Sequence, residues 1–190
     1  MENIQETTKK KSSVRKIRKK KEGGIYMKNA LTRKVFVEFS LLGNNIIENI
    51  HNILKKKYQG KCSKEGFIKS ESIRVINYSS GVVNGNNVVF DVLFECMICK
   101  PIEGMIFKCN VINITKAGIR AEIKAEESPV VVFVARDHHY KNKNFSKINQ
   151  GDDITVKVIG VRFELNDDYI SIIAELIKKN KSMKMKIKLK

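Results

Sequence analysis

Hydrophobic positions in the first half of the chain predict a small sheet with one helix. In residues 31–42, β-branched and aromatic side chains alternate, which predicts a strand covered on one face. Residues 46–57 place isoleucines and a leucine at helical spacing after a Gly-Asn-Asn cap, which predicts an amphipathic helix. Residues 67–78 and 88–100 predict two antiparallel strands, because an Asn-Gly hairpin signal lies between them.

The second half of the chain changes to short strands at short intervals. Five stretches predict strands: 105–115, 119–123, 129–135, 154–163 and 169–176. A long polar connection, in which we expect a short helix, separates the third from the fourth. Five short strands with a long connection at this place are typical of an OB-fold barrel. The sequence therefore predicts an α+β unit followed by an all-β five-stranded barrel.

The formal net charge of +17 adds to this picture because most of it lies outside the predicted elements. Residues 1–28 hold ten Lys or Arg against three Glu, and residues 176–190 hold seven Lys and no acidic residue. Such tails attract RNA or DNA with little sequence preference, although a solubility role or a nuclear import signal explains them equally well. No apolar run approaches the ~20 residues of a membrane span, and the N-terminus lacks the apolar block of a secretory signal. We therefore expect an intracellular protein without a membrane partner.

The four cysteines are too few for a disulfide scaffold and indicate a reducing compartment. Cys96 and Cys99 have the spacing of a zinc knuckle, but they lie in one predicted strand, where positions three apart face opposite sides. Cys62 and Cys109 do not form a second pair, so core cysteines are the expectation and no metal or cofactor is predicted. Nucleotide-binding and serine-hydrolase motifs do not occur, which favours a protein without catalytic residues of its own.

The junction between the two halves carries a resemblance to a known family. Residues 99–106 (CKPIEGMI) resemble the Lys-Pro junction of the stalk subunit of multisubunit RNA polymerases. This family includes the seventh subunit of eukaryotic polymerase II and the archaeal E-type subunit. Residues 111–119 and 132–134 also match its pattern, and residues 60–68 (GKCSKEGFI) stand where the family has its glycine-rich tip loop. The resemblance covers about residues 31–177, and the order of these motifs carries it.

Composition and the resemblance together predict a division of the chain into four parts. Residues 1–28 are expected to be a disordered basic tail and residues 178–190 a second one. Residues 29–100 correspond to the N-terminal tip (RNP-like) domain, a small antiparallel sheet with one helix. Residues 101–177 correspond to the OB-fold RNA-binding barrel. The basic N-terminal extension is not part of the family pattern, and the Lys, Asn and Ile richness suits a polymerase encoded by a large DNA virus.

OB barrels bind single strands by stacking bases on aromatic side chains and by pairing phosphates with cations. Phe107 and Phe133 could stack on bases in this way, but either ring could instead be part of the barrel core. Many barrels of this kind carry aromatics beside the glycine of the first hairpin, where this chain has Ile119 and Arg120. The residues expected to contact RNA are Lys108, Lys116, Arg120, Phe133, Arg136, His138 and Tyr140.

In the family, the tip loop docks on the polymerase core, whereas without the resemblance an ordinary helix-to-strand loop is the simpler interpretation. Glycines let a backbone lie close to a partner surface. The predicted docking residues are Gly60, Lys61, Cys62, Ser63, Lys64, Glu65, Gly66, Lys100 and Pro101.

The resemblance implies a non-catalytic stalk subunit that contacts nascent RNA and the core polymerase subunits, with a small helical stalk partner in many members. Its location would then be the nucleus or, for a viral protein, the virion and host-cell cytoplasm. A free-standing OB-fold RNA-binding protein of translation or exosome type is the first alternative. An RNA-processing enzyme is the second, and it would need an acidic metal cluster in the fold.

Overall fold

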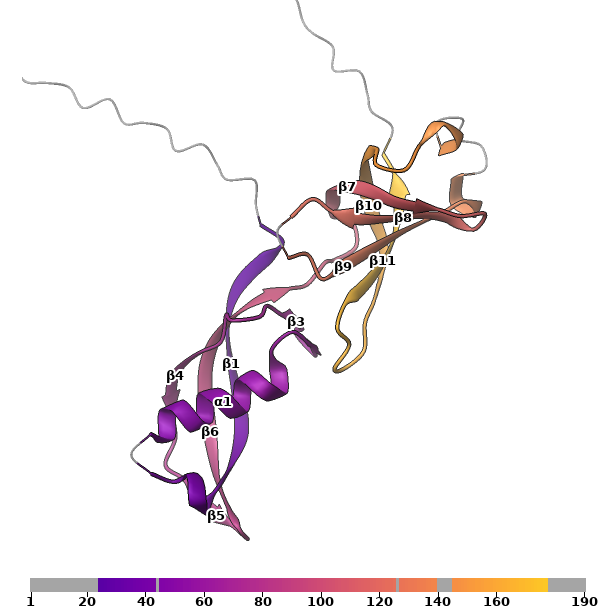
Figure 1. The fold of residues 1–190 in the computed structure, drawn as a ribbon. Coiled ribbons are helices and arrows are strands. Elements are labelled where there is room, and N and C mark those ends of the chain that lie inside the picture. Colours follow the sequence, from indigo (N-terminus) through magenta and orange to yellow (C-terminus); the bar gives the residue numbers. More distant parts are fainter. Residues whose placement is uncertain (1–23, 44, 126, 140–144, 178–190) are drawn as a thin grey trace, which may run out of the picture.

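An antiparallel sheet with one helix forms the first half of the protein (Figure 1). The computed structural model describes residues 24–43, 45–125, 127–139 and 145–177. The helix lies along one face of the sheet, as its amphipathic sequence predicts. The elements are β1 (Tyr26–Glu38), the 3₁₀ turn η1 (Phe39–Leu41), α1 (Ile46–Tyr58), β2 (Cys62–Ser63), β3 (Gly66–Ile68), β4 (Arg74–Tyr78), β5 (Val82–Asn84) and β6 (Asn87–Cys99).

The sheet is organised around β6. Strand β1 pairs with it along its whole length, from Tyr26 opposite Cys99 to Glu38 opposite Asn87. The short strands β5, β4 and β3 share its other edge, one after another toward Cys99. Strand β2 extends this edge by pairing with β3. A single long strand therefore fixes the register of the whole sheet.

The helix buries its apolar stripe against alternating positions of β6. Ile50 and Leu54 are fully buried, as are Val92 and Phe94 on the facing strand. The ring of Tyr58, at the end of the helix, stacks on Phe94 with 6.3 Å between centroids. Burying four such side chains contributes on the order of 1.5–3 kcal/mol each, so the helix is held mainly by packing.

The second half is a closed five-stranded barrel, coloured from red (β7) to yellow (β11) in Figure 1. Going round the barrel, the order is β7, β8, β9, β11, β10 and back to β7. The β9–β11 pair is parallel and the other four pairs are antiparallel. This is the OB-fold arrangement that the sequence predicts. The strands are β7 (Ile106–Ile114), β8 (Gly118–Ile123), β9 (Val130–Ala135), β10 (Asp153–Arg162) and β11 (Ile170–Leu176), with 3₁₀ turns η2 (Asp137–His139) and η3 (Phe145–Lys147) between β9 and β10.

The end of β6 belongs to both cores. Cys96 is buried in the core of the helix-bearing sheet, whereas Cys99 is buried in the barrel core. The chain then enters the barrel through Gly104, whose backbone N–H donates to Val158 at 2.8 Å. Val158 in turn donates to the Met105 carbonyl at 2.8 Å, so the connection is held on the barrel wall.

Three details of the first half differ from the sequence predictions. Strand β1 begins at Tyr26, so the last residues of the stretch predicted to be a disordered tail are paired with β6. The stretch predicted as one strand over 67–78 is two strands, because Glu71 adopts φ +55 and the Ser72 hydroxyl donates to Lys69 at 2.6 Å. Phe39, predicted in the first strand, lies in η1 and is half exposed. Residues 1–23 and 178–190 lie outside the described residues.

No helix in the described ranges is long and apolar enough to cross a membrane.

Candidate nucleic-acid interface and docking cleft

The β7–β8 turn forms the centre of the candidate nucleic-acid interface. Thr115 closes the turn, since its backbone N–H donates to the Gly118 carbonyl at 2.8 Å. The intervening Lys116 and Ala117 are exposed at the tip. Gly118 itself is buried, and a Cβ there would lie 2.4 Å from the Val134 carbonyl oxygen. The tight packing of this glycine holds the turn against β9.

Arg136 braces this turn. Its Nε donates to the Lys116 carbonyl at 2.8 Å, and its Nη2 donates to the Thr115 carbonyl at 3.1 Å. The guanidinium also lies 5.3 Å from the ring centroid of Phe145, at cation–π distance. Arg136 remains exposed, so it brings a second positive charge to the turn while holding its backbone.

Arg120 and Phe133 lie directly opposite each other on β8 and β9. Arg120 is exposed and Phe133 is half-buried, while the neighbouring Val132 and Val134 point into the core. Phe133 therefore lies on the outer surface, and the core interpretation is wrong for this residue. Phe107 is different, because it packs against the barrel core.

We call Lys116, Arg120, Phe133 and Arg136 the turn patch. It combines three cations and one aromatic ring on the outside of the barrel, which is the combination that single-stranded nucleic acid requires.

The two adjacent histidines have different environments. His138 is exposed beside the turn patch, as its predicted role requires. His139 is buried: its Nε2 accepts the backbone N–H of Leu176 at 2.9 Å, so Nδ1 carries the proton and donates to Ala135 at 2.8 Å. Its ring stacks on Phe145 with centroids 5.3 Å apart. His139 thus ties the ends of β9 and β11 together, a role that the sequence pattern gave no reason to expect.

Lys108 and Tyr140 are the remaining predicted RNA-contact residues. Lys108 is exposed near the start of β7, opposite Thr155, and the strand runs roughly 20 Å from there to the turn. The structure therefore separates it from Lys116. Tyr140 lies outside the described residues.

The predicted docking loop is largely occupied by contacts within the chain. Cys62 donates its backbone N–H to Asp167 at 2.8 Å and accepts from Asn166 at 2.9 Å, which joins β2 to the β10–β11 loop of the barrel. Its thiol is also buried, and burial, together with Asp167 and Asp168, raises the pKa of Cys62 to about 11. A partner would therefore not reach this side chain.

The other loop residues divide into buried and accessible ones. Ser63 is buried, and its hydroxyl donates to the Gly66 carbonyl at 3.0 Å. Gly66 is buried with φ +131, and Lys100 packs beside it. The remaining predicted residues include buried Pro101, half-buried Gly60, Lys61 and Glu65, and exposed Lys64 and Lys100.

Glu65 forms an ion pair that the sequence did not reveal. Arg33 of β1 donates to its carboxylate at 2.5 Å, and the Ser63 hydroxyl lies 3.1 Å from the same oxygen. Desolvation raises the pKa of Glu65, but these hydrogen bonds and the Arg33 charge outweigh it and hold that pKa below its usual value. Arg33 and Glu65 are far apart in sequence, so no local pattern indicates their pairing.

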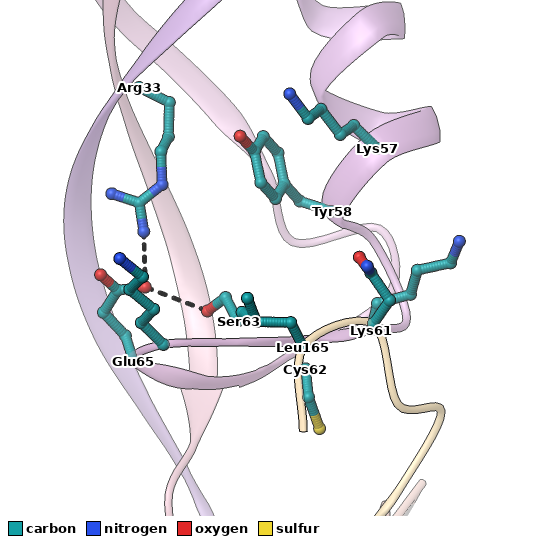
Figure 2. A pocket seen from close by; sticks show the side chains of 10 residues that line it. Arg33, Lys57, Tyr58, Lys61, Cys62, Ser63, Glu65 and Leu165 are labelled. Carbon is teal, nitrogen blue, oxygen red and sulfur yellow. Dashed lines mark hydrogen bonds and ion pairs between the residues drawn. The ribbon is translucent and has the colours of Figure 1, made fainter. Parts of the chain in front are cut away.

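A cleft opens beside this ion pair, between the docking loop, the end of α1 and the β10–β11 loop (Figure 2). Its volume is about 320 Å³. It is lined by Arg33, Lys57, Tyr58, Lys61, Cys62, Ser63, Lys64, Glu65, Leu165 and Asn166.

The four cysteines do not form a metal site. Cys96 and Cys99 are buried in different cores, as the strand geometry predicts. Burial raises the pKa of Cys96 to about 11, and that of Cys99 and Cys109 to about 12. Within the part of the chain that the structure describes, no group of three or more His, Cys, Asp or Glu residues is arranged to hold a metal ion.

Similarity to known proteins extends over most of the chain. A protein of Acanthamoeba polyphaga mimivirus, provisionally named a DNA-directed RNA polymerase subunit, is 29% identical over 174 residues, which cover 80% of this chain and 82% of that protein. Subunit RPB7 of Glycine max RNA polymerase II is 24% identical over 75% of this chain and 93% of its own length. The chain is thus similar over most of its length to proteins that are named as RNA polymerase subunits.

The seventh subunit of Arabidopsis thaliana RNA polymerase II matches equally well, at 24% identity over the same shares of the two chains. These homologues confirm the predicted resemblance, including its link to a viral polymerase subunit. No family model matches the chain. Among solved structures, GSP13 from Bacillus subtilis aligns with 46% of this chain and 68% of its own at 20% identity, with a TM-score of 0.33.

Proposed function

We propose that this protein is a non-catalytic stalk subunit of a DNA-directed RNA polymerase. The observation that carries the proposal is the similarity to seventh subunits, which extends over most of the chain and over most of each relative. In this proposal residues 29–100 anchor the subunit to the core enzyme, and residues 101–177 contact nascent RNA. The basic tails, 1–28 and 178–190, add affinity for RNA without sequence preference.

The turn patch supports the RNA part of the proposal. Lys116, Arg120 and Arg136 bring positive charge to the surface that carries the half-buried ring of Phe133, so phosphates and a stacked base can be bound together. Because these contacts read no base edge, the expected binding has little sequence preference. Lys108 stays a predicted contact for a longer RNA that also reaches the start of β7.

The RNA contacts can be tested by equilibrium binding of labelled single-stranded RNA at several salt concentrations. Arg120→Ala and Lys116→Ala are each expected to weaken binding. Each should also reduce the slope of log affinity against log salt concentration by about one, which corresponds to the loss of one phosphate contact. Lys34→Ala, an exposed lysine of the helix-bearing sheet, is the matched control and should change little. Equal losses for all three variants would place the RNA elsewhere, and an effect of tail deletion alone would place it on the tails.

The polymerase assignment is tested by purifying the tagged protein from its native cells at moderately high salt. Recovery of the two large polymerase subunits in near-stoichiometric amounts would support it and would also show whether a small helical stalk partner is present. RNA with ribosomal or exosome proteins, and no polymerase, would instead support a free-standing OB-fold RNA-binding protein. We expect the complex in the nucleus or, for a viral polymerase, in the virion and the host-cell cytoplasm.

A further inference from the structure

The cleft of Figure 2 has an apolar side formed by Leu165 and by the ring of Tyr58, whose centroid lies 5.5 Å from the Lys57 ammonium. Leu165 is 60% exposed. Opposite it lies the ring of Tyr58, which is half-buried and backed by Phe94. An exposed leucine facing a fixed aromatic ring offers a place for one aliphatic side chain of a partner.

The loop that carries Leu165 is held rigidly in place. The backbone N–H of Glu164 donates to the Asp167 carboxylate at 2.7 Å, which closes the loop. Cys62 then holds the loop through two backbone hydrogen bonds, to Asn166 and Asp167. The backbone on both sides of Leu165 is therefore held by hydrogen bonds, so binding there loses little loop entropy.

The rim of the cleft is strongly basic. Lys57, Lys61 and Lys64 line it, and none of them forms an ion pair with another described residue. Arg33 is the fourth cation, and the lone lining carboxylate, Glu65, is already paired with it. Figure 2 shows that the guanidinium of Arg33 points toward the carboxylate of Glu65.

Charge decides which occupant fits. Both tails of this chain are basic, with ten Lys or Arg against three Glu in residues 1–28 and no acidic residue in 178–190, so neither complements the rim. A nucleic acid would satisfy the lysines but would leave Leu165 uncovered and would face Glu65 in the wall. A peptide with carboxylates on both sides of an aliphatic residue satisfies both the rim and the apolar side.

We infer that the cleft binds an acidic, aliphatic-containing segment of a partner polymerase subunit, with the aliphatic side chain between Leu165 and Tyr58. The inference rests on the proposed function for the identity of the partner, but not for the chemistry of the cleft. Because the cleft is built from both the helix-bearing sheet and the barrel, the segment would bind the two halves at once.

The chemistry is tested first on the full chain with a fluorescent Asp-Asp-Leu-Glu-Asp peptide. We expect saturable binding that weakens with salt and that is lost when the peptide leucine is replaced by serine. The variant Lys57→Glu, Lys61→Glu, Lys64→Glu should bind about tenfold more weakly or worse. The matched control reverses three exposed lysines outside the cleft, Lys34, Lys56 and Lys147, and should bind within about threefold of the wild type.

The leucine contact is tested with Leu165→Asp, compared with Ile106→Asp, which alters a similarly exposed residue of the barrel. Only Leu165→Asp should abolish peptide binding, and far-UV circular dichroism should show both variants folded. Equal binding of the serine peptide, or equal losses in the two triple variants, would overturn the inference. Tighter competition by a short single-stranded RNA than by an unlabelled peptide would assign the cleft to nucleic acid and overturn it as well.

The partner is then identified by placing the photo-cross-linker p-benzoylphenylalanine at Leu165 in the protein purified with its native complex. A cross-link to an acidic, aliphatic segment of a core polymerase subunit supports the inference, and a cross-link to a basic segment or to RNA contradicts it. If peptide binding succeeds but no polymerase subunit is recovered, the proposed function fails while the chemistry of the cleft stands.

Discussion

Replacing Gly66 with alanine should destabilise the protein more than replacing any glycine in an open turn. Gly66 has φ +131, a backbone conformation that L residues rarely adopt, and holding alanine there costs on the order of 1–3 kcal/mol. The new Cβ would also lie 2.5 Å from the backbone oxygen of Cys99 and 3.1 Å from the Lys100 Cβ. The oxygen belongs to a residue paired with β3, so it cannot move away without disturbing the β3–β6 pairing.

Relieving this overlap adds about 1–3 kcal/mol, which gives an expected loss of about 2–6 kcal/mol in the free energy of unfolding. Gly85→Ala is the matched control. Gly85 also has positive φ, +59, but nothing lies within 4 Å of the position of a Cβ. Its substitution should therefore cost only about 1 kcal/mol.

Urea unfolding followed by far-UV circular dichroism measures both losses on the full chain. Gly66→Ala should lower the urea midpoint by about 0.5–2.5 M relative to Gly85→Ala, for a urea slope of about 2 kcal/mol/M. If the two variants unfold at the same midpoint, the close approach of the docking loop to β6 is not rigid, and the argument for a fixed cleft wall loses its basis.

Three further predictions concern polar and titratable side chains. His139→Ala removes the hydrogen-bond partners of the Leu176 N–H and the Ala135 carbonyl. It should lower the free energy of unfolding by about 1–3 kcal/mol for each group left unsatisfied. The control, His138→Ala at an exposed site, should change the urea midpoint little. The pKa of Glu65 is lowered in the folded state, so its contribution to stability is present above the ordinary value of 4.5 and is lost as pH falls through the lowered pKa. Glu65→Gln should therefore flatten the acid side of a plot of unfolding free energy against pH. An unchanged plot would contradict the ion pair. The four cysteines are buried and have raised pKa values. A thiol reagent such as DTNB should therefore react with the native protein at pH 8 far more slowly than with the protein unfolded in urea. Rapid reaction with the native protein would show that a core opens.

The sequence predicted the elements whose residues alternate between core and solvent. The helix Ile46–Tyr58 and the five barrel strands are such elements, because each buries one regular stripe of side chains. The start of β1 carries no such signal. Residues Met27–Ala30 are all exposed although they pair with β6, so hydrophobic spacing cannot reveal them. The sequence carries no signal for the break between β3 and β4, because this break depends on Glu71 at positive φ and not on a glycine or proline.

The candidate sites were less predictable because they depend on contacts between distant parts of the chain. Lys116 and Arg136 meet because the β7–β8 turn and the end of β9 lie together in the closed barrel. The basic residues near the turn could thus be selected by charge alone, but the distance between Lys108 and the turn follows only from the geometry. The cleft wall formed by Leu165 depends on pairing between β2 and a loop about a hundred residues later. Chain order gives no indication of that pairing.

The order of the strands along the chain has a consequence for folding during synthesis. Every strand of the helix-bearing sheet lies before residue 100, so its core can form before the barrel strands have been made. The barrel cannot close until β11 emerges, since β11 joins β9 to β10. Until then β9 has an unpaired edge, which invites association with other chains. The backbone of Cys62 can form its bonds to Asn166 and Asp167 only after these residues have left the ribosome, so the cleft is completed late, shortly before β11 emerges.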